Sequence, residues 1–104
     1  VDVQALSDEV ITPFTDLLLH DLGPDLADDL PQGVATGSEW RTAPLWGIGL
    51  TGVVGHEHYL HDGRARSVEE AILWHGGEAE SARDAFMGLT APDRSLVLRF
   101  LSAL

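Results

Sequence analysis

The sequence predicts a mainly α-helical chain with long irregular loops, and three observations support this fold class. Helix caps and apolar residues at three- and four-residue spacing recur from Ser67 to Leu104. Between residues 21 and 38, Pro, Gly and Asp occur at a density that breaks regular structure. A length of 104 residues allows one small domain with a modest core.

Composition excludes several functions. The chain has 6 basic and 17 acidic residues, which gives a formal net charge of -11. Such a charge repels phosphate backbones and anionic lipid headgroups, so we expect no nucleic-acid partner. No apolar run approaches the roughly 20 residues that span a bilayer, so we expect no membrane insertion. The absence of cysteine excludes disulfides, thiolate metal sites and thiol nucleophiles within these residues.

The N-terminal part has few regular signals. Residues 1–12 are expected to form an extended arm, and residues 13–66 a loop-rich region. Within that region, Thr15 is expected to cap one or two turns of helix that end at Leu19. The leucine run at residues 17–19 is expected to fill the core from one tight turn. Residues 21–38 are interpreted as a long loop.

A tryptophan-rich segment follows at residues 40–51. Its large apolar side chains alternate with Pro44, Gly47 and Gly49. We interpret this segment as a short 3₁₀ or irregular helix packed under something flat and apolar, because glycine allows close backbone approach and tryptophan carries a large apolar area. Ordinary core filling is an equally valid interpretation.

Clustered histidines come next. His56, His58 and His61, with nearby carboxylates, offer ligands that suit zinc, iron or manganese. A His-x-His spacing is weak evidence, however, and a loop of surface histidines is the commoner explanation of such a pattern.

The clearest helix is expected over residues 67–75. Ser67 and Glu70 form a capping box, and Gly76 with Gly77 provides a left-handed exit. Apolar spacing places His75 on the same face as Ala71 and Ile72. His75 is therefore a core histidine, a cation at the helix terminus, or an axial ligand to a buried cofactor.

Two further helices complete the region of three helices at residues 67–104. One is expected over residues 78–87, with Ala79, Ala82 and Phe86 facing inward. Thr90 caps the last helix, whose apolar stripe contains Leu96, Val97, Phe100, Leu101 and Leu104. We expect these two helices to pack antiparallel and close a small core.

Three strings resemble a known family when taken in order. They are TDLLLHDLGPDLAD at residues 15–28, EWRTAPLWGIGLT at 39–51 and YLHDGRARSVEEAILWHGGEAE at 59–80. Together they resemble the C-terminal part of bacterial di-haem oxidoreductases related to cytochrome c peroxidase, often labelled thiol oxidoreductases. The resemblance covers nearly the whole chain from Ile11 onward. It implies the distal part of a cytochrome c-like helical domain.

The resemblance also implies a function and a set of site residues. It implies a periplasmic protein that holds two covalently attached haems and exchanges electrons with a substrate such as peroxide. At the end of the 67–75 helix, where relatives have Met or Tyr, the distal axial ligand would be His75. The haem pocket would further include Trp46 and Trp74 as walls, His61 near the haem edge, and Arg41, Arg64 and Arg66 as partners of the haem propionates.

The chain departs from the family pattern in one respect. Without a cysteine it has no Cys-x-x-Cys-His motif, so haem c would be attached through an upstream haem-bearing segment that works with an N-terminal cytochrome domain. We therefore expect a fragment that is not active as a peroxidase in isolation. Two alternatives remain: a non-haem metal-binding module built on the histidine cluster, and a helical domain that self-associates into a homo-oligomer.

Overall fold

The structure is a computed structural model that describes residues 10–55 and 57–104. Most of the expected N-terminal arm, and His56 of the histidine cluster, lie outside the described residues. The described elements are β1 (Leu19–Asp21), η2 (Pro24–Leu26), β2 (Glu39–Arg41), α1 (Ile48–Val53), α2 (Val68–Trp74), η3 (Gly77–Ala79), α3 (Glu80–Met87) and α4 (Ala91–Ser102). Helices outweigh the two short strands, which confirms the prediction of a mainly α chain.

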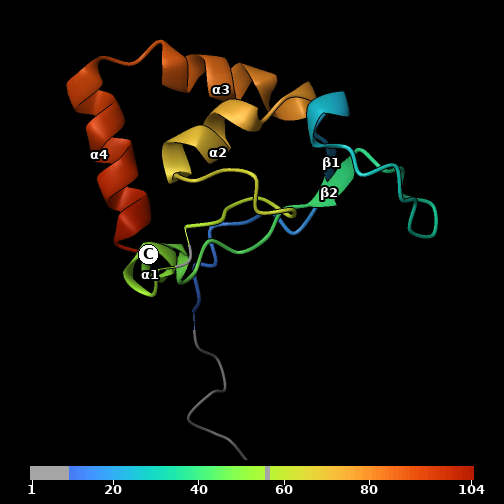
Figure 1. Cartoon of the computed structure of the whole chain (residues 1–104), viewed down its shortest axis with the longest axis horizontal. Coiled ribbons are helices and arrows are strands. Elements are labelled where there is room, and N and C mark those ends of the chain that lie inside the picture. Colours follow the sequence, from blue (N-terminus) through green and yellow to red (C-terminus); the bar gives the residue numbers. More distant parts are fainter. Residues whose placement is uncertain (1–9, 56) are drawn as a thin grey trace, which may run out of the picture.

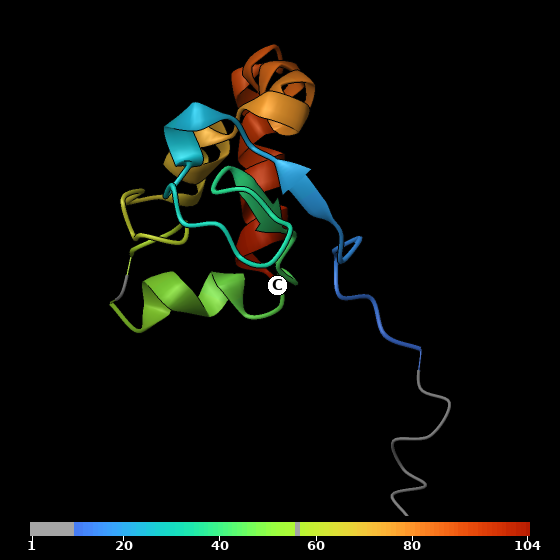
Figure 2. The same ribbon diagram turned by 90° about the vertical axis from the view of Figure 1, so that its right-hand side faces the viewer.

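The helices and the strand pair occupy different sides of the molecule. Figure 1 shows α2 and α3 at one end, with α4 running from that end to α1, while the β1–β2 pair lies on the other side. Seen from that side in Figure 2, the strand pair lies in front of α4. α4 contacts both α1 and α2, and β1 contacts η3. The C-terminus is joined to the start of α1, because the amide of Gly47 donates a hydrogen bond to the carbonyl of Leu104 (2.9 Å).

Local capping explains where α2 and α4 begin. The Ser67 hydroxyl accepts a hydrogen bond from the amide of Glu70 (3.0 Å), and the Glu70 carboxylate accepts one from the amide of Arg66 (2.9 Å). The Thr90 hydroxyl accepts a hydrogen bond from the amide of Asp93 (3.3 Å). Each cap satisfies an amide that has no partner within its helix. Both helix starts therefore agree with the sequence prediction.

The helix expected at Thr15 is absent. Thr15 instead donates a hydrogen bond from its hydroxyl to the carbonyl of Thr42 (2.6 Å) and accepts one from the amide of Leu17 (3.0 Å). The chain then continues as β1, which pairs antiparallel with β2 so that His20 lies opposite Trp40. Cross-strand bonds replace the helical ones, and the prediction was wrong.

The leucine run was also placed wrongly. Leu17, Leu18 and Leu19 are 60%, 58% and 51% exposed. Leu17 and Leu18 lie in the irregular segment before β1, and Leu19 is the first residue of this strand, so the three side chains do not form the single tight turn that would place them together in the core.

Three other expectations need correction. The segment at residues 40–51 belongs to β2 at its start and to the regular α-helix α1 at its end, rather than to a 3₁₀ or irregular helix. Residues 77–79 form the separate turn η3, so α3 begins at Glu80. The helices α3 and α4 meet at a corner rather than lying antiparallel, as both views show (Figures 1 and 2).

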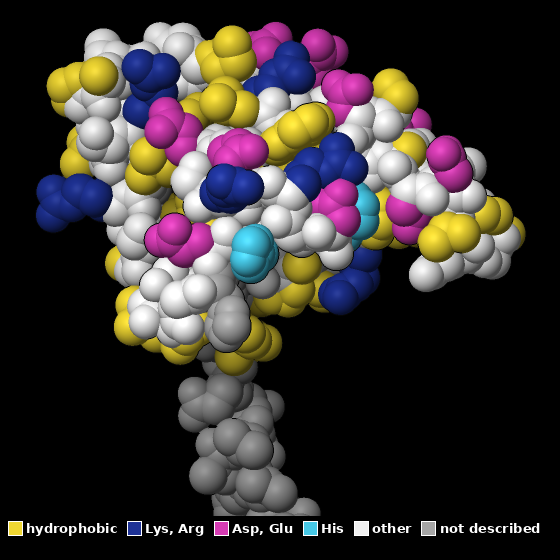
Figure 3. Space-filling view, viewed as in Figure 1, with side chains coloured by type: hydrophobic (Ala, Val, Ile, Leu, Met, Phe, Trp, Pro, Cys, Tyr) yellow, Lys and Arg dark blue, Asp and Glu magenta, His cyan; other side chains and the backbone are white. Residues whose placement is uncertain are grey.

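The closed core is small. Among the described hydrophobic residues, only Leu26, Ala65 and Phe86 are buried. Apolar side chains are exposed on α1 and α4, and Figure 3 shows them over the corner of α3 and α4 and around α1. No helix in residues 10–55 and 57–104 is both long and apolar enough to cross a bilayer. The elements therefore surround an open interior rather than a filled one.

Candidate functional site

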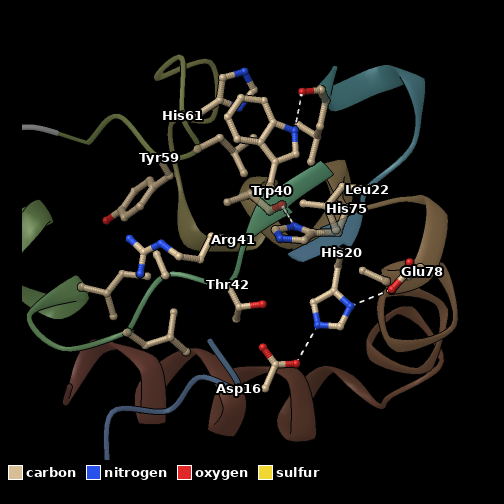
Figure 4. Close-up of a pocket in the computed structure, with 17 residues that line it drawn as sticks. Asp16, His20, Leu22, Trp40, Arg41, Thr42, Tyr59, His61, His75 and Glu78 are labelled. Atoms are coloured by element: carbon tan, nitrogen blue, oxygen red, sulfur yellow. Dashed lines mark hydrogen bonds and ion pairs between the residues drawn. The ribbon is translucent and has the colours of Figure 1, made fainter. Parts of the chain in front are cut away.

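The open interior is a cavity of about 760 Å³. Side chains from both strands, α1, α2 and the loop at residues 57–66 surround it, as Figure 4 shows. The lining is Asp16, His20, Leu22, Leu26, Trp40, Arg41, Thr42, Ala43, Leu45, Ile48, Tyr59, Leu60, His61, Ala71, His75, Glu78 and Ala79. A largely apolar wall with a few polar groups is typical of sites for small molecules and cofactors.

His75 lies at the wall where α2 ends. It is the C-cap residue of α2, with φ −67° and ψ 129°, and its amide donates to the carbonyl of Ile72. Its Nδ1 is 2.7 Å from the carbonyl oxygen of Ala71. A carbonyl only accepts, so Nδ1 carries a proton, and in the neutral ring the lone pair is then on Nε2. Among the described residues the ring of His75 makes this one hydrogen bond, so in the neutral ring Nε2 is available as a ligand.

Trp40 and His61 form a second part of the wall. Their rings stack with centroids 3.9 Å apart and planes inclined by 22°. The Trp40 Nε1–H donates to the carbonyl of Leu26 (3.1 Å), which fixes the indole against η2. The sequence pointed to His61 but missed Trp40, although Trp40 directly precedes the chosen Arg41. Its place in the wall depends on the pairing of β2 with β1, which local sequence patterns do not indicate.

The structure brings only some of the predicted pocket residues together. Arg41, His61 and His75 line the cavity, whereas Trp46, Trp74, Arg64 and Arg66 do not. The Trp46 Nε1–H donates to the carbonyl of Thr12 (2.8 Å), and Trp46 is 53% exposed. The guanidinium of Arg64 pairs with Asp62 (2.7 Å) and covers the ring of Trp74 at 4.8 Å. Arg64 therefore has a local carboxylate partner, and the two predicted tryptophan walls lie elsewhere.

The histidine cluster has other contacts. His58 Nδ1 lies 3.3 Å from the carbonyl oxygen of Gly63, and His61 stacks on Trp40. Within the described chain, no three His, Asp or Glu side chains are grouped as a metal site would require. His56 is outside the described residues, so the proposed three-histidine set stays a prediction.

A charged triad, unrecognised in the sequence, lines the opposite wall. His20 lies between two carboxylates, with Nε2 2.6 Å from Asp16 Oδ2 and Nδ1 2.6 Å from Glu78 Oε2. Figure 4 shows the imidazole between them at the edge of the cavity. The hydrogen bonds to Glu78 and then Asp16 raise the pKa of His20. Local sequence patterns do not indicate this triad, because Glu78 lies 58 positions after His20.

The carboxylates respond in the opposite direction. The pKa of Asp16 is lowered to about 2, first by the amide of Leu18 and then by His20. The hydrogen bond from His20 also lowers the pKa of Glu78. When His20 is protonated, both of its nitrogens donate to ionised carboxylates, and the contact with Glu78 links β1 to η3.

This triad predicts a pH-dependent contribution to stability. Raising the pKa of His20 stabilises the fold below the ordinary value of 6.5, and this contribution is lost as pH rises through the raised value. Lowering the pKa of Asp16 and Glu78 stabilises the fold above their ordinary values of 3.8 and 4.5, and this contribution is lost at more acid pH. The triad should therefore stabilise the fold most between pH 4.5 and pH 6.5.

His20→Gln should lower the urea midpoint most within this window and progressively less at alkaline pH. His58→Gln is the control, because His58 is exposed and contacts a single carbonyl; it should change the midpoint little at any pH. An equal loss for His20→Gln at every pH would show that the ionic interaction contributes nothing.

An apolar cavity with a helix-anchored imidazole in its wall is typical of helical domains that bind a cofactor or a small ligand. Comparison with known families makes this class more specific. A family model described as "Di-haem oxidoreductase, putative peroxidase" matches residues 1–104, and the chain belongs to this family. No curated protein and no solved structure matches the chain. The resemblance found in the sequence is thereby confirmed at the level of an oxidoreductase family whose name implies haem.

Proposed function

We propose that this chain forms the distal side of a haem pocket in a periplasmic, cytochrome c-like di-haem oxidoreductase. In this proposal His75 is the axial ligand that the chain supplies. The haem c is attached to a Cys-x-x-Cys-His motif outside these residues, because the chain has no cysteine. The whole protein passes electrons to or from a substrate such as peroxide, and this chain alone does not.

The observation that carries the proposal is the orientation of His75. Haem iron accepts imidazole as an axial ligand, and ligating histidines commonly donate their other ring N–H to a carbonyl. The 2.7 Å contact between Nδ1 and the Ala71 carbonyl fits that arrangement. It fixes the tautomer whose lone pair is on Nε2 and limits rotation of the ring.

Other residues of the cavity supply groups that a haem pocket uses. Leu22, Leu26 and Ile48 supply apolar wall, and Trp40 supplies a flat aromatic surface. Arg41 lines the same cavity, and a guanidinium pairs well with carboxylates such as propionates. When bound, the haem supplies a one-electron redox centre whose potential depends on axial ligation, hydrogen bonding and burial. The Ala71 carbonyl orients the imidazole, and the apolar residues of the cavity lie against the ring system.

The test is a spectroscopic comparison of variants of the haem-loaded protein. The chain is expressed with the segment that carries its Cys-x-x-Cys-His motif, in a host that matures c-type cytochromes. His75→Ala should convert the haem from low spin to high spin, and added imidazole should restore the low-spin spectrum. His58→Ala is the control, since His58 does not line the cavity. A low-spin spectrum that is unchanged in His75→Ala would contradict the proposal.

A further inference from the structure

Arg83 reaches back from α3 to the residue that ends α2. Its Nη1 donates a hydrogen bond to the carbonyl of His75 at 3.1 Å, and this contact is partly buried. The two residues are separated by the Gly76–Gly77 turn and η3. The contact therefore joins two helices through the backbone of His75, whose ring is part of the cavity wall.

The carbonyl of His75 needs such a donor. The backbone of His75 is extended rather than helical, with ψ at 129°, so its carbonyl oxygen points away from the helix axis. Carbonyls at a helix C-terminus have no partner within the helix. In this structure the Arg83 guanidinium supplies one, while the His75 amide stays bonded to Ile72 at 3.2 Å. Both backbone groups of His75 are thus held.

Arg83 is itself held in place by acidic neighbours. Its Nε and Nη2 donate to the Asp84 carboxylate at 3.0 and 2.9 Å, and Nη2 also donates to Glu80 at 3.0 Å. These bonds leave Nη1 for the carbonyl of His75. A planar guanidinium can make all these contacts at once because its donors have a fixed geometry. The ion pairs therefore orient the donor rather than occupy it.

We propose that Arg83 is a positioning residue for His75. It fixes the peptide that follows the His75 Cα, and the Ala71 carbonyl fixes the ring, so that Nε2 is held at one orientation in the cavity. The role as axial ligand rests on the function proposed above. The fixation of the ring is a property of this chain and is measurable without haem.

The first measurement uses the chain without cofactor. Nitrogen chemical shifts of the His75 ring report the ratio of the Nδ1–H to the Nε2–H tautomer. Arg83→Ala should lower this ratio roughly 2- to 10-fold, the factor expected from weakening one net hydrogen bond at the ring. Arg99→Ala is the matched control, because Arg99 is exposed in the last turn of α4. Glu80→Gln should also leave the ratio unchanged, since Asp84 still orients the guanidinium.

The second measurement uses the haem-loaded protein. The g-values of low-spin ferric haem depend on the rotation of its axial imidazole, so Arg83→Ala should shift or broaden the signal, whereas Arg99→Ala should not. Arg83→Lys keeps a donor without the fork and should give an intermediate shift. If Arg83→Ala does not fold, Arg83→Lys decides the matter in both measurements.

The outcomes separate this inference from the proposed function. An unchanged tautomer ratio and an unchanged ferric signal in the Arg83 variants, with low spin lost in His75→Ala, would overturn the role of Arg83 alone. Low spin retained in His75→Ala would overturn the proposed ligand. A changed tautomer ratio in Arg83→Ala would even then show that Arg83 orients the ring.

Discussion

Gly77→Ala is expected to destabilise the chain by about 2 to 5 kcal/mol. Gly77 has a φ of 53°, and a left-handed conformation costs a non-glycine residue roughly 1 to 2 kcal/mol. A Cβ at this position would also collide with the carbonyl of Asp21 and lie 2.7 Å from the amide nitrogen of Gly23. Backbone atoms cannot rotate away, and overpacking of this kind costs about 1 to 3 kcal/mol more.

A second glycine gives the matched control for this experiment. Gly33 has a φ of 63°, and a Cβ built there would meet nothing within 4 Å. Gly33→Ala should therefore cost only the backbone term, about 1 to 2 kcal/mol. Urea denaturation of the three proteins measures both values. If the two variants lost the same stability, the close approach of η3 to β1 would not contribute.

The same substitution should disturb the site. The Gly76–Gly77 turn lies between His75 and Glu78, and it packs on the chain that leaves β1. Displacing this turn moves the C-cap of α2 and the carboxylate that binds His20. We therefore expect the nitrogen shifts of both imidazoles to change in Gly77→Ala and to stay unchanged in Gly33→Ala.

Local signals in the sequence predicted the helical half of the fold. The Ser67 and Thr90 caps depend on a hydroxyl and an amide three residues apart, and such contacts form wherever the neighbouring chain is helical. His75 followed from the same logic, because helical spacing placed it on the face of Ala71. Its position in the cavity wall agrees with that prediction, whereas its role as ligand stays a proposal.

Long-range pairing could not be predicted in the same way. Thr15 is a good capping residue, but in the structure its hydroxyl bonds to Thr42, 27 positions away. Two three-residue strands give almost no periodic signal, so neither β1 nor the wall residue Trp40 was expected. The His20 triad was not predicted for the same reason, since Asp16 precedes β1 whereas Glu78 belongs to η3. The antiparallel packing of α3 and α4 was wrong because apolar stripes do not fix the angle between helices.

Leu26→Ala is expected to cost about 2 to 5 kcal/mol, the range measured for truncating buried leucines. Leu26 is 1% exposed, lines the cavity, and its carbonyl holds the indole of Trp40. With so few buried side chains, the loss of one of them removes a large part of the closed core. Leu30→Ala is the control, because Leu30 lies four residues later and is 67% exposed. It should change the free energy of unfolding by less than about 0.5 kcal/mol. Urea denaturation, with Trp fluorescence as the probe, measures both variants. Equal losses of the free energy of unfolding would mean that Leu26 is not part of the cooperative core.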